Sequence, residues 1–345
     1  MAKLFFLISG EHQTLPVSEV QAILKAEGID YRIVERLTQV LRLEADANCV
    51  EAIKLRSALT RICCREIFNC DANLSEILAN IRSDFLDEFI EGGESFAVRV
   101  RRVEGVTPEL IRVELERKLG EQILEKAKNT RVNLSNPQKT FFGVLTDSRF
   151  IFGLKTAEII PKPFSERRPR RRPFFHPSAM PAKLARVMVN LAQPKRGDLM
   201  LDPFCGTGGM LVEAGLIGCR VIGFDAKPHM LRGGLKNLKH YGTNVEGLAI
   251  ADARYLPVTR VDCVATDPPY GRSASTLGTN TRLIVEDFLS AVGDTLPRGG
   301  KICMAAPKTI RIGETAEEAG FKHLESHFVY VHRSLTREIV VFEKT

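Results

Sequence analysis

The sequence predicts an α/β protein in which an irregular α+β region precedes a doubly wound sheet of seven strands. Residues 199–307 contain five short apolar runs separated by segments of helix length, and most of these runs close on an acidic residue. Residues 321–344 then read as two long strands joined directly, which predicts an antiparallel pair that closes the sheet. Ligands of such sheets bind at the carboxyl ends of the parallel strands, so functional residues are expected there.

The C-terminal half supplies the parallel strands in chain order. They are LMLD (199–202), RVIGFD (220–225), EGLAIAD (246–252), DCVATD (262–267) and KICMAAP (301–307). Strands that alternate with helix-length segments are typical of a parallel sheet built from crossover connections. Together with the closing pair they predict a domain over residues 174–345.

The N-terminal half is less regular and has no phosphate-binding loop. Residues 1–60 contain the strands LFFLIS, YRIVERL and VLRLEA and a helix near VSEVQAILKAEG, which predict a small α+β unit. Residues 61–160 predict a second unit, with the helices LSEILANIRSDF and TPELIRVELERKLGEQI and the strands FAVRVRRV, RVNLS, KTFFGVLTD and RFIFGLK. A Pro/Arg-rich linker, residues 161–173, follows.

The positive charge of the chain is concentrated near this linker. The formal net charge is +7, but residues 1–165 hold 23 Lys and Arg against 24 Asp and Glu, whereas residues 166–345 hold 26 against 18. Five arginines fall within the linker: Arg167, Arg168, Arg170, Arg171 and Arg172. Such a run is either a solvated linker or a set of contacts to nucleic-acid phosphates.

Composition indicates a globular protein of the cytoplasm. Hydrophobic residues make up 44% of the chain and charged residues 26%, while no apolar run approaches the roughly 20 residues that span a bilayer. The N-terminal apolar stretch is too short for a signal peptide. The eight cysteines are scattered without CxxC or Cys/His spacing, so we expect small core residues in a reducing compartment, with no metal. No protein partner is evident.

The motif DPFCGTGG, residues 202–209, lies between a predicted strand and a predicted helix. Gly206, Gly208 and Gly209 allow the backbone to turn sharply and to approach a ligand closely. No Lys-Ser/Thr follows the glycines, so the motif is not a P-loop. Taken alone, it is equally explained as a plain tight turn.

Two more acidic residues close the next two strands. Asp225 comes 23 residues after Asp202, where a carboxylate accepts both hydroxyls of a ribose. Asp252 closes the third strand, where it would meet an adenine amino group. A single aspartate here is better explained as a helix N-cap, but three in register with a glycine turn favour an adenosine ligand. Because the turn lacks the GxGxxG form, S-adenosylmethionine is favoured over NAD.

The stretch DPPYG, which follows the fourth strand, predicts the chemistry. Pro268 and Pro269 fix a rigid corner, so the Asp267 carboxylate and the Pro268 carbonyl are held in place. These acceptors would take the protons of an exocyclic base amino group and direct its lone pair at a sulfonium methyl, while Tyr270 stacks on the base. The alternative is a rigid strand exit, but DPFCGTGG in the same sheet favours methyl transfer.

The segment RPFFHPSAMPAKLARVMVNLA, residues 172–192, predicts a bend followed by an amphipathic helix. Phe174 and Phe175 are either core residues or part of a bend that lies over the cofactor. We predict Phe175 and His176 beside the cofactor, with His176 as a hydrogen-bonding residue rather than a base. Next to a base-modifying site, the arginine run is predicted to contact RNA phosphates.

DPFCGTGG and DPPYG, preceded by RPFFHPSAM, resemble the motifs of THUMP-containing tRNA guanine-N2-methyltransferases, specifically the archaeal enzymes that modify guanosine ten. The resemblance covers residues 172–306 closely and implies a Rossmann-like class I methyltransferase domain. Residues 1–60 resemble a ferredoxin-like unit and residues 61–160 a THUMP domain, which in this family holds the 3′ end of tRNA. The resemblance implies S-adenosylmethionine-dependent transfer of one or two methyl groups to N2 of a guanosine in tRNA.

The resemblance also assigns residues to the site. The cofactor contacts fall on Asp202, Cys205, Gly206, Thr207 and Gly208, with Asp225 at the ribose and Asp252 at the adenine. The catalytic tetrad falls on Asp267, Pro268, Pro269 and Tyr270.

Two other functions compete with this interpretation. DPPY also serves N6-adenine methyltransferases acting on DNA or other RNA, but no helix-turn-helix or zinc-finger pattern precedes the linker. Guanine offers N1–H and N2–H side by side to one carboxylate, whereas adenine offers a single amino donor beside an acceptor. The second alternative is a tRNA-binding protein without catalysis, and the intact DPPY and glycine turn argue against it.

Overall fold

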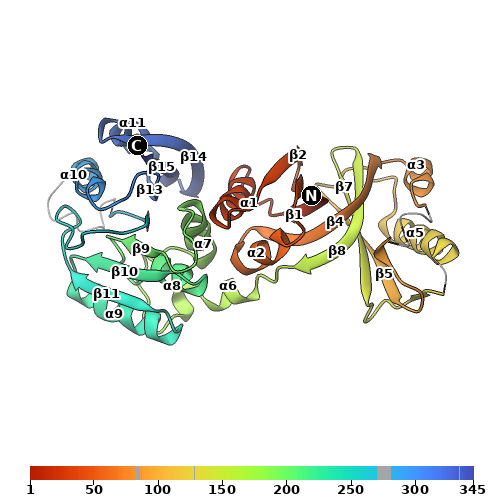
Figure 1. The fold of residues 1–345 in the computed structure, drawn as a ribbon, viewed down its shortest axis with the longest axis horizontal. Coiled ribbons are helices and arrows are strands. Elements are labelled where there is room, and N and C mark those ends of the chain that lie inside the picture. The colour runs from red at the N-terminus through yellow and green to blue at the C-terminus, as the bar shows by residue number, and fades with distance from the viewer. Residues whose placement is uncertain (83–85, 87, 128, 270–280, 334) are drawn as a thin grey trace. The chain divides into compact units, whose positions relative to one another are not determined.

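A computed structural model shows the fold (Figure 1) and describes the chain except for residues 83–85, 87, 128, 270–280 and 334. The chain divides into two compact units, each built around one sheet. Unit 1 comprises residues 1–17, 29–54 and 60–159, and unit 2 comprises residues 18–28, 55–59 and 160–345.

Unit 1 is centred on a sheet of eight described strands in the order β2-β3-β1-β4-β8-β7-β5-β6. They are β1 (Ala2–Ile8), β2 (Tyr31–Leu37), β3 (Val40–Ala45), β4 (Thr60–Asp71), β5 (Ser95–Arg102), β6 (Arg131–Val132), β7 (Lys139–Thr146) and β8 (Arg149–Glu158). The long strand β4 pairs with β1 on one side and with β8 on the other, both antiparallel. One continuous sheet therefore runs through residues 2–158.

Sequence analysis did not predict β4. The strand begins where a boundary between two units was expected, and its burial does not alternate strictly between successive residues. The period-two signal of a half-buried strand is therefore weak there. The short helix α2 (Cys49–Arg56) was missed as well, because it has no pronounced apolar face.

Three other helices are described in the N-terminal region: α1 (Leu15–Ala26), α3 (Leu74–Ala79) and α5 (Arg112–Lys126). A helix was predicted from residue 107, but α5 begins five residues later. Thr107 has a φ of 53°, outside the right-handed helical region, and therefore cannot belong to the helix. Leu115, Leu119 and Ile123 recur every fourth residue and form the buried face of α5.

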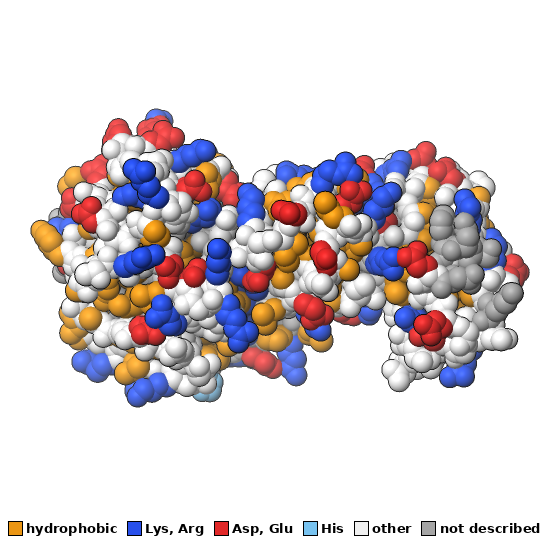
Figure 2. Space-filling view, in the orientation of Figure 1, with side chains coloured by type: hydrophobic (Ala, Val, Ile, Leu, Met, Phe, Trp, Pro, Cys, Tyr) orange, Lys and Arg blue, Asp and Glu red, His pale blue; other side chains and the backbone are white. Residues whose placement is uncertain are grey.

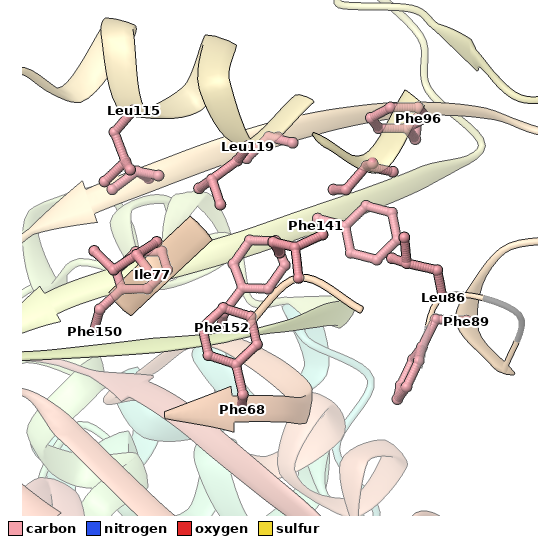
Figure 3. Close-up of a cluster of buried hydrophobic side chains, with 14 of the residues drawn as sticks. Phe68, Ile77, Leu86, Phe89, Phe96, Leu115, Leu119, Phe141, Phe150 and Phe152 are labelled. Atoms are coloured by element: carbon pink, nitrogen blue, oxygen red, sulfur yellow. The ribbon is translucent and has the colours of Figure 1, made fainter. Parts of the chain in front are cut away.

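Aromatic side chains fill the core that α3 and α5 form with the sheet (Figure 3). The rings of Phe141 and Phe152 are stacked, with centroids 5.9 Å apart, and Phe68 lies 5.2 Å from Phe152. Gly143 leaves room for this packing, since a Cβ there would lie 2.5 Å from the Phe150 ring. Gly153 of β8 is more constrained, since its Cβ would lie 2.1 Å from the carbonyl oxygen of Arg65 on β4.

Unit 2 contains a seven-stranded sheet in the order β11-β10-β9-β12-β13-β15-β14, as far as the chain is described. Its strands are β9 (Leu199–Asp202), β10 (Arg220–Asp225), β11 (Val245–Ile250), β12 (Cys263–Thr266), β13 (Lys301–Pro307), β14 (Phe321–His332) and β15 (Leu335–Lys344). β9 to β13 are parallel, while β14 and β15 form the closing antiparallel pair. The predicted doubly wound fold is confirmed.

The helical segments of unit 2 connect and cover these strands (Figure 1). They are α6 (Lys162–Glu166), the 3₁₀ helix η1 (Pro169–Arg171), α7 (Ala182–Leu191), α8 (Gly209–Leu216), α9 (Pro228–His240), α10 (Thr281–Gly293), the 3₁₀ helix η2 (Lys308–Ile310) and α11 (Ile312–Glu318). Val285 and Phe288 of α10 and Ile312 of α11 pack against strand residues such as Val340 in one buried cluster. The predicted linker thus contains two short helical segments.

The cysteines lie in the interior, as the sequence predicts. All eight cysteines are buried free thiols, as predicted for small core residues, and burial raises the pKa of Cys49, Cys70 and Cys219 to about 11. Within the described ranges, no helix is long and apolar enough to cross a bilayer.

The close approach of β4 and β8 gives a stability test. Gly153→Ala should destabilise the protein by about 3 kcal/mol or more, because the methyl group collides with backbone that belongs to a paired strand. Gly120→Ala is the matched control: a Cβ there meets nothing within 4 Å, and alanine in a helix interior stabilises by about 0.5–1 kcal/mol. Urea unfolding of both variants measures the difference. Equal midpoints would show that the sheet does not depend on a glycine at this position.

Candidate active site

The carboxyl ends of three strands bring aspartates together. Asp202 ends β9, Asp225 ends β10, and Asp267 follows β12 directly. The Asp202 carboxylate accepts hydrogen bonds from the Thr266 hydroxyl, at 2.7 Å, and from the Phe204 backbone N–H, at 3.2 Å. The three carboxylates lie close enough for Asp225 and Asp267 to affect the ionisation of Asp202. The site therefore has the position and the acidic character that the sequence predicts.

Asp202 is unusual because its side chain is almost fully buried, with only 2% of the residue exposed. Burial is the main cause that raises its pKa to about 7; the negative charges of Asp267 and Asp225 act in the same direction, and the bonds from Thr266 and Phe204 oppose the change. A cation placed at this sheet edge would relieve the repulsion among the carboxylates.

The glycine turn after β9 is held from two sides. Gly206 and Gly208 have φ values of 50° and 77°, which residues other than glycine rarely adopt. The backbone N–H of Gly206 donates to the Asp225 carboxylate at 2.9 Å, and the N–H of Gly208 donates to the Cys205 carbonyl at 2.7 Å. The side chains of Cys205 and Thr207 are buried, so the turn presents mainly its backbone.

Helix α9 supports the turn through residues that sequence analysis missed. Gly234 allows the contact, since a Cβ there would lie 3.1 Å from the Gly206 carbonyl oxygen. The Asn237 amide donates to the Thr207 carbonyl at 2.9 Å and to the Phe174 carbonyl at 3.0 Å, and accepts from the Phe174 N–H. A glycine pair in HMLRGGLKNLKH, the helix-length segment between the second and third predicted strands, was the available signal. Nothing local marks Asn237.

The bend before α7 separates the two phenylalanines. Phe174 packs on Gly233, where a Cβ would lie 2.0 Å from its ring, and is partly buried. Phe175 is 40% exposed, with the Arg170 guanidinium 5.8 Å from its ring centroid. His176 Nδ1 lies 2.7 Å from the Ser178 hydroxyl, a local hydrogen bond. Contacts of Phe175 and His176 with a cofactor stay predictions.

Asp252 follows β11, and its carboxylate is engaged by Arg254. The guanidinium of Arg254 donates to both carboxylate oxygens, with the shortest contact at 2.6 Å. This hydrogen bonding lowers the pKa of Asp252 and accounts for much of its capacity as an acceptor. The contact of Asp252 with an adenine amino group stays a prediction. The amino group would have to compete with Arg254 for the Asp252 carboxylate.

Asp267 and Pro268 emerge from the centre of the sheet. One Asp267 oxygen lies 3.5 Å from Nη2 of Arg337, and the two side chains are only 18% and 13% exposed. Arg337 lies on β15 and pairs in register with Pro307, the last residue of β13. Pro268 is buried and Pro269 is partly buried, while Tyr270 lies outside the described residues. Sequence analysis missed Arg337 and Thr266, whose partners are remote in sequence.

The arginine run divides into interior and surface residues. Arg167 donates to the fully buried Glu213 of α8 at 2.7 Å and 3.1 Å, and Arg186 contacts the same carboxylate at 2.9 Å. Arg172 is 5% exposed and donates through Nε to the Arg167 carbonyl. The structure thus gives Arg167 and Arg172 roles inside the protein. The exposed members are Arg168, Arg170 and Arg171.

The raised pKa of Asp202 predicts a pH dependence of stability. Between pH 4 and 7 the folded protein holds a proton that the unfolded chain releases, so stability should fall as pH rises through this window, by at most about 4 kcal/mol. Asp202→Asn removes the titration but keeps an acceptor for Thr266. The variant should gain stability over the wild type as pH rises from 5 to 8, whereas the exposed Asp287→Asn should not. Parallel urea-unfolding curves for Asp202→Asn and wild type would contradict this.

Comparison with known proteins places both halves of the chain. Residues 169–338 match the family model of the RMKL-like methyltransferase domain, and residues 71–154 match that of the THUMP domain. Crystal structures of TrmN from Thermus thermophilus (TM-score 0.55, 22% identity, covering 99% of this chain and all of that one) and of SMU.472 complexed with SAH (0.53, 13%, 100% and 98%) share the fold.

Curated relatives align over the full length. The tRNA (guanine(10)-N2)-dimethyltransferase of Methanothermobacter thermautotrophicus is 38% identical over 99% of this chain and 99% of its own length. The enzyme of the same name from Methanocaldococcus jannaschii is 32% identical over 98% and 99%. The sequence-based assignment is therefore confirmed, and the chain belongs to the family of THUMP-containing, S-adenosylmethionine-dependent tRNA (guanine(10)-N2)-dimethyltransferases.

Proposed function

We propose that this chain transfers methyl groups from S-adenosylmethionine to N2 of guanosine ten in tRNA, twice in succession. The observation that carries the proposal is the position of Asp267 and Pro268, at the end of β12 beside the Asp202–Asp225 edge of the same sheet. Methyl donor and base acceptors would then meet at one sheet edge. Full-length likeness to dimethyltransferases supports the base, the position and the number of methyl groups.

The residues of the sheet edge fit the cofactor. S-adenosylmethionine, when bound, supplies an electrophilic methyl group on a sulfonium cation. The side-chain-free turn at Gly206 and Gly208 leaves space for a ligand against its backbone, and the carboxylates of Asp202 and Asp225 suit a cationic ligand. Asp225 already holds the turn through Gly206, so its oxygens lie where ribose hydroxyls are expected.

Asp267 and Pro268 act on the base. The N2 lone pair of guanine is delocalised into the ring, so the amino group is a poor nucleophile. Hydrogen bonds from its protons to well-placed acceptors make the nitrogen more nucleophilic. The Asp267 carboxylate accepts from N1–H and N2–H, and the Pro268 carbonyl accepts the second N2 proton. Two consecutive prolines keep both acceptors from relaxing, so no reorganisation is needed as the nitrogen attacks. Each transfer releases one proton from N2, which the Asp267 carboxylate is placed to receive. After the first transfer one N2 proton remains, and Asp267 can accept a hydrogen bond from it.

Arg337 positions Asp267. At 3.5 Å, its guanidinium attracts the carboxylate and limits the orientations that a short side chain at a strand end can adopt. Its positive charge also offsets repulsion between Asp267 and Asp202. We infer that Arg337 acts through Asp267 and does not touch the base.

The N-terminal half binds tRNA. We retain the division into a ferredoxin-like unit at residues 1–60, a THUMP domain at 61–160, a linker at 161–173 and a catalytic domain at 174–345. Figure 2 shows basic and acidic side chains interspersed on the face in view, which agrees with a local RNA surface in place of a uniformly basic one. Since the substrate is tRNA, we propose the cytoplasm as the place of action.

The acceptor role of Asp267 is tested by turnover. Asp267→Ala should lower the rate of methyl transfer by about 10²–10⁴-fold while tRNA and cofactor affinities change little, because the interaction strengthens only as the nitrogen attacks. Asp267→Asn should be nearly as impaired, since its amide N–H would face the guanine N1–H. Arg337→Gln should lose part of the same rate, with partial rescue by Arg337→Lys. Asp262→Asn, at the opposite end of β12, is the control.

Nucleoside mass spectrometry of the reacted tRNA measures the rate of methyl transfer and identifies the methylated base. Methyl groups on adenine would replace the guanine assignment by the N6-adenine alternative. Cofactor binding without any transfer would favour the non-catalytic tRNA-binding alternative. Full activity of Asp267→Asn on guanine would contradict the proposed bidentate contact of Asp267 with N1–H and N2–H.

The exposed arginines give a separate test. Replacing Arg168, Arg170 and Arg171 together by Gln should weaken tRNA binding and reduce the slope of log affinity against log salt, by about 0.7–0.9 for each phosphate that the protein no longer neutralises. Arg167→Gln should instead lower the unfolding temperature, because it removes a partner of the buried Glu213. If the triple variant binds tRNA with the wild-type affinity and slope, these arginines do not contact phosphates.

A further inference from the structure

The hairpin of β14 and β15 exposes aromatic rings at the catalytic edge of the sheet. Phe328 and Tyr330 are 48% and 72% exposed, and Val331 beside them is 40% exposed. The two rings lie two residues apart on one strand, so their side chains leave the same face of the sheet. Large aromatic residues are mostly buried in folded chains, and a contiguous exposed group of them marks a binding surface.

Strand register places this surface at the same end of the sheet as Asp267, two strands beyond β13. The carboxyl end of β13, at Pro307, pairs with Arg337 of β15, and Arg337 pairs in turn with Val329, the residue between the two rings. Arg337 faces Asp267 at 3.5 Å. The cross-strand partners of Phe328 and Tyr330 are Glu338 and Thr336, so the rings lie on the face of the hairpin opposite to Arg337. The rings therefore lie on the strand next to Arg337 and at the same end of the sheet, on its other face.

Cations accompany the rings. Nζ of Lys308, in η2, lies 5.1 Å from the ring centroid of Phe328, and both Lys308 and Arg333 are exposed. Arg311 is also exposed but lies 3.6 Å from Glu314. The partly buried Glu338 contributes one negative charge to this face. The exposed ends of the group are thus aromatic rings and cations, which suit bases and phosphates respectively.

We propose that this hairpin surface, formed by Lys308, Phe328, Tyr330 and Arg333, binds the tRNA strand next to the target guanosine. The proposal rests on the function proposed above. A base that reaches Asp267 must leave its stack, and its neighbour then loses a stacking partner. Tyr330 replaces that partner, while Lys308 and Arg333 bind adjoining phosphates. The surface would lower the cost of presenting the guanosine, beyond what the THUMP domain contributes.

A second copy of the chain is the competing occupant, because β14 is an edge strand of the sheet. Two copies that met through Phe328 and Tyr330 would bring their Lys308 and Arg333 residues toward one another, and like charges disfavour that arrangement. A polyanion meets the same cations favourably. The charge of the surface therefore favours RNA.

The test uses substitutions at the two ends of β14 in the full chain. Tyr330→Ala and Phe328→Ala should each weaken tRNA binding by about 5–100-fold, the range expected for one stacked base, and Tyr330→Phe should restore most of the affinity. Lys308→Gln and Arg333→Gln should flatten the salt dependence. Leu324→Ala and Lys322→Gln, at the other end of the strand, are the matched controls and should bind normally. Calorimetry should find S-adenosylmethionine affinity unchanged in all variants.

Each outcome decides between named possibilities. Unchanged tRNA affinity of Tyr330→Ala and Phe328→Ala, with guanine still methylated, overturns the hairpin surface and leaves the proposed function intact. Failure of the wild type to methylate guanine contradicts the proposed function, while tRNA affinity, which needs no turnover, still tests the surface. A sedimentation change in Tyr330→Ala without loss of tRNA affinity assigns the surface to self-association and also overturns the proposal.

Discussion

The hydrogen bond from the Thr266 hydroxyl to the Asp202 carboxylate joins the two halves of the site. Asp202 begins the glycine turn, and Thr266 is the last residue of β12, immediately before Asp267. Both groups are almost fully buried, so the bond is not weakened by competing water. It fixes the end of the cofactor strand against the end of the catalytic strand. Methyl transfer needs the donor and acceptor groups within a fraction of an ångström of their working positions, and this bond lies between them.

The same burial leaves the sheet edge electrostatically unsatisfied. Three carboxylates converge there, and the pKa of Asp202 rises to about 7 because its charge is poorly solvated. Two neighbouring aspartates have arginine partners: Arg337 faces Asp267 and Arg254 engages Asp252. A site built this way favours a cationic ligand and suits a sulfonium cofactor better than an anionic one. In the protein without cofactor, the buried charge of Asp202 lowers the stability at neutral pH.

Much of the fold was predictable because its signals are local. β9 and β10 occupy the predicted residues, and the closing pair β14–β15 lies where two long apolar-patterned runs were found. The glycine turn was equally visible, since positive φ values strongly favour glycine. What could not be predicted depends on distant partners. β4 crosses an expected boundary, Asn237 serves a turn thirty residues away in sequence, and Arg337 meets Asp267 only through the order of the strands.

The arginine run shows that residues close together in sequence can lie in different environments. Five arginines within residues 167–172 predicted one phosphate-binding surface. In the structure Arg167 pairs with the buried Glu213, and Arg172 lies against Gly209 at the start of α8. Buried arginines of this kind need a carboxylate or carbonyl partner, and α8 and the linker backbone supply both. They hold the segment before α7 on the helix that follows the glycine turn. The linker thus packs on α8 through Arg167 and Arg172, while Arg168, Arg170 and Arg171 remain exposed.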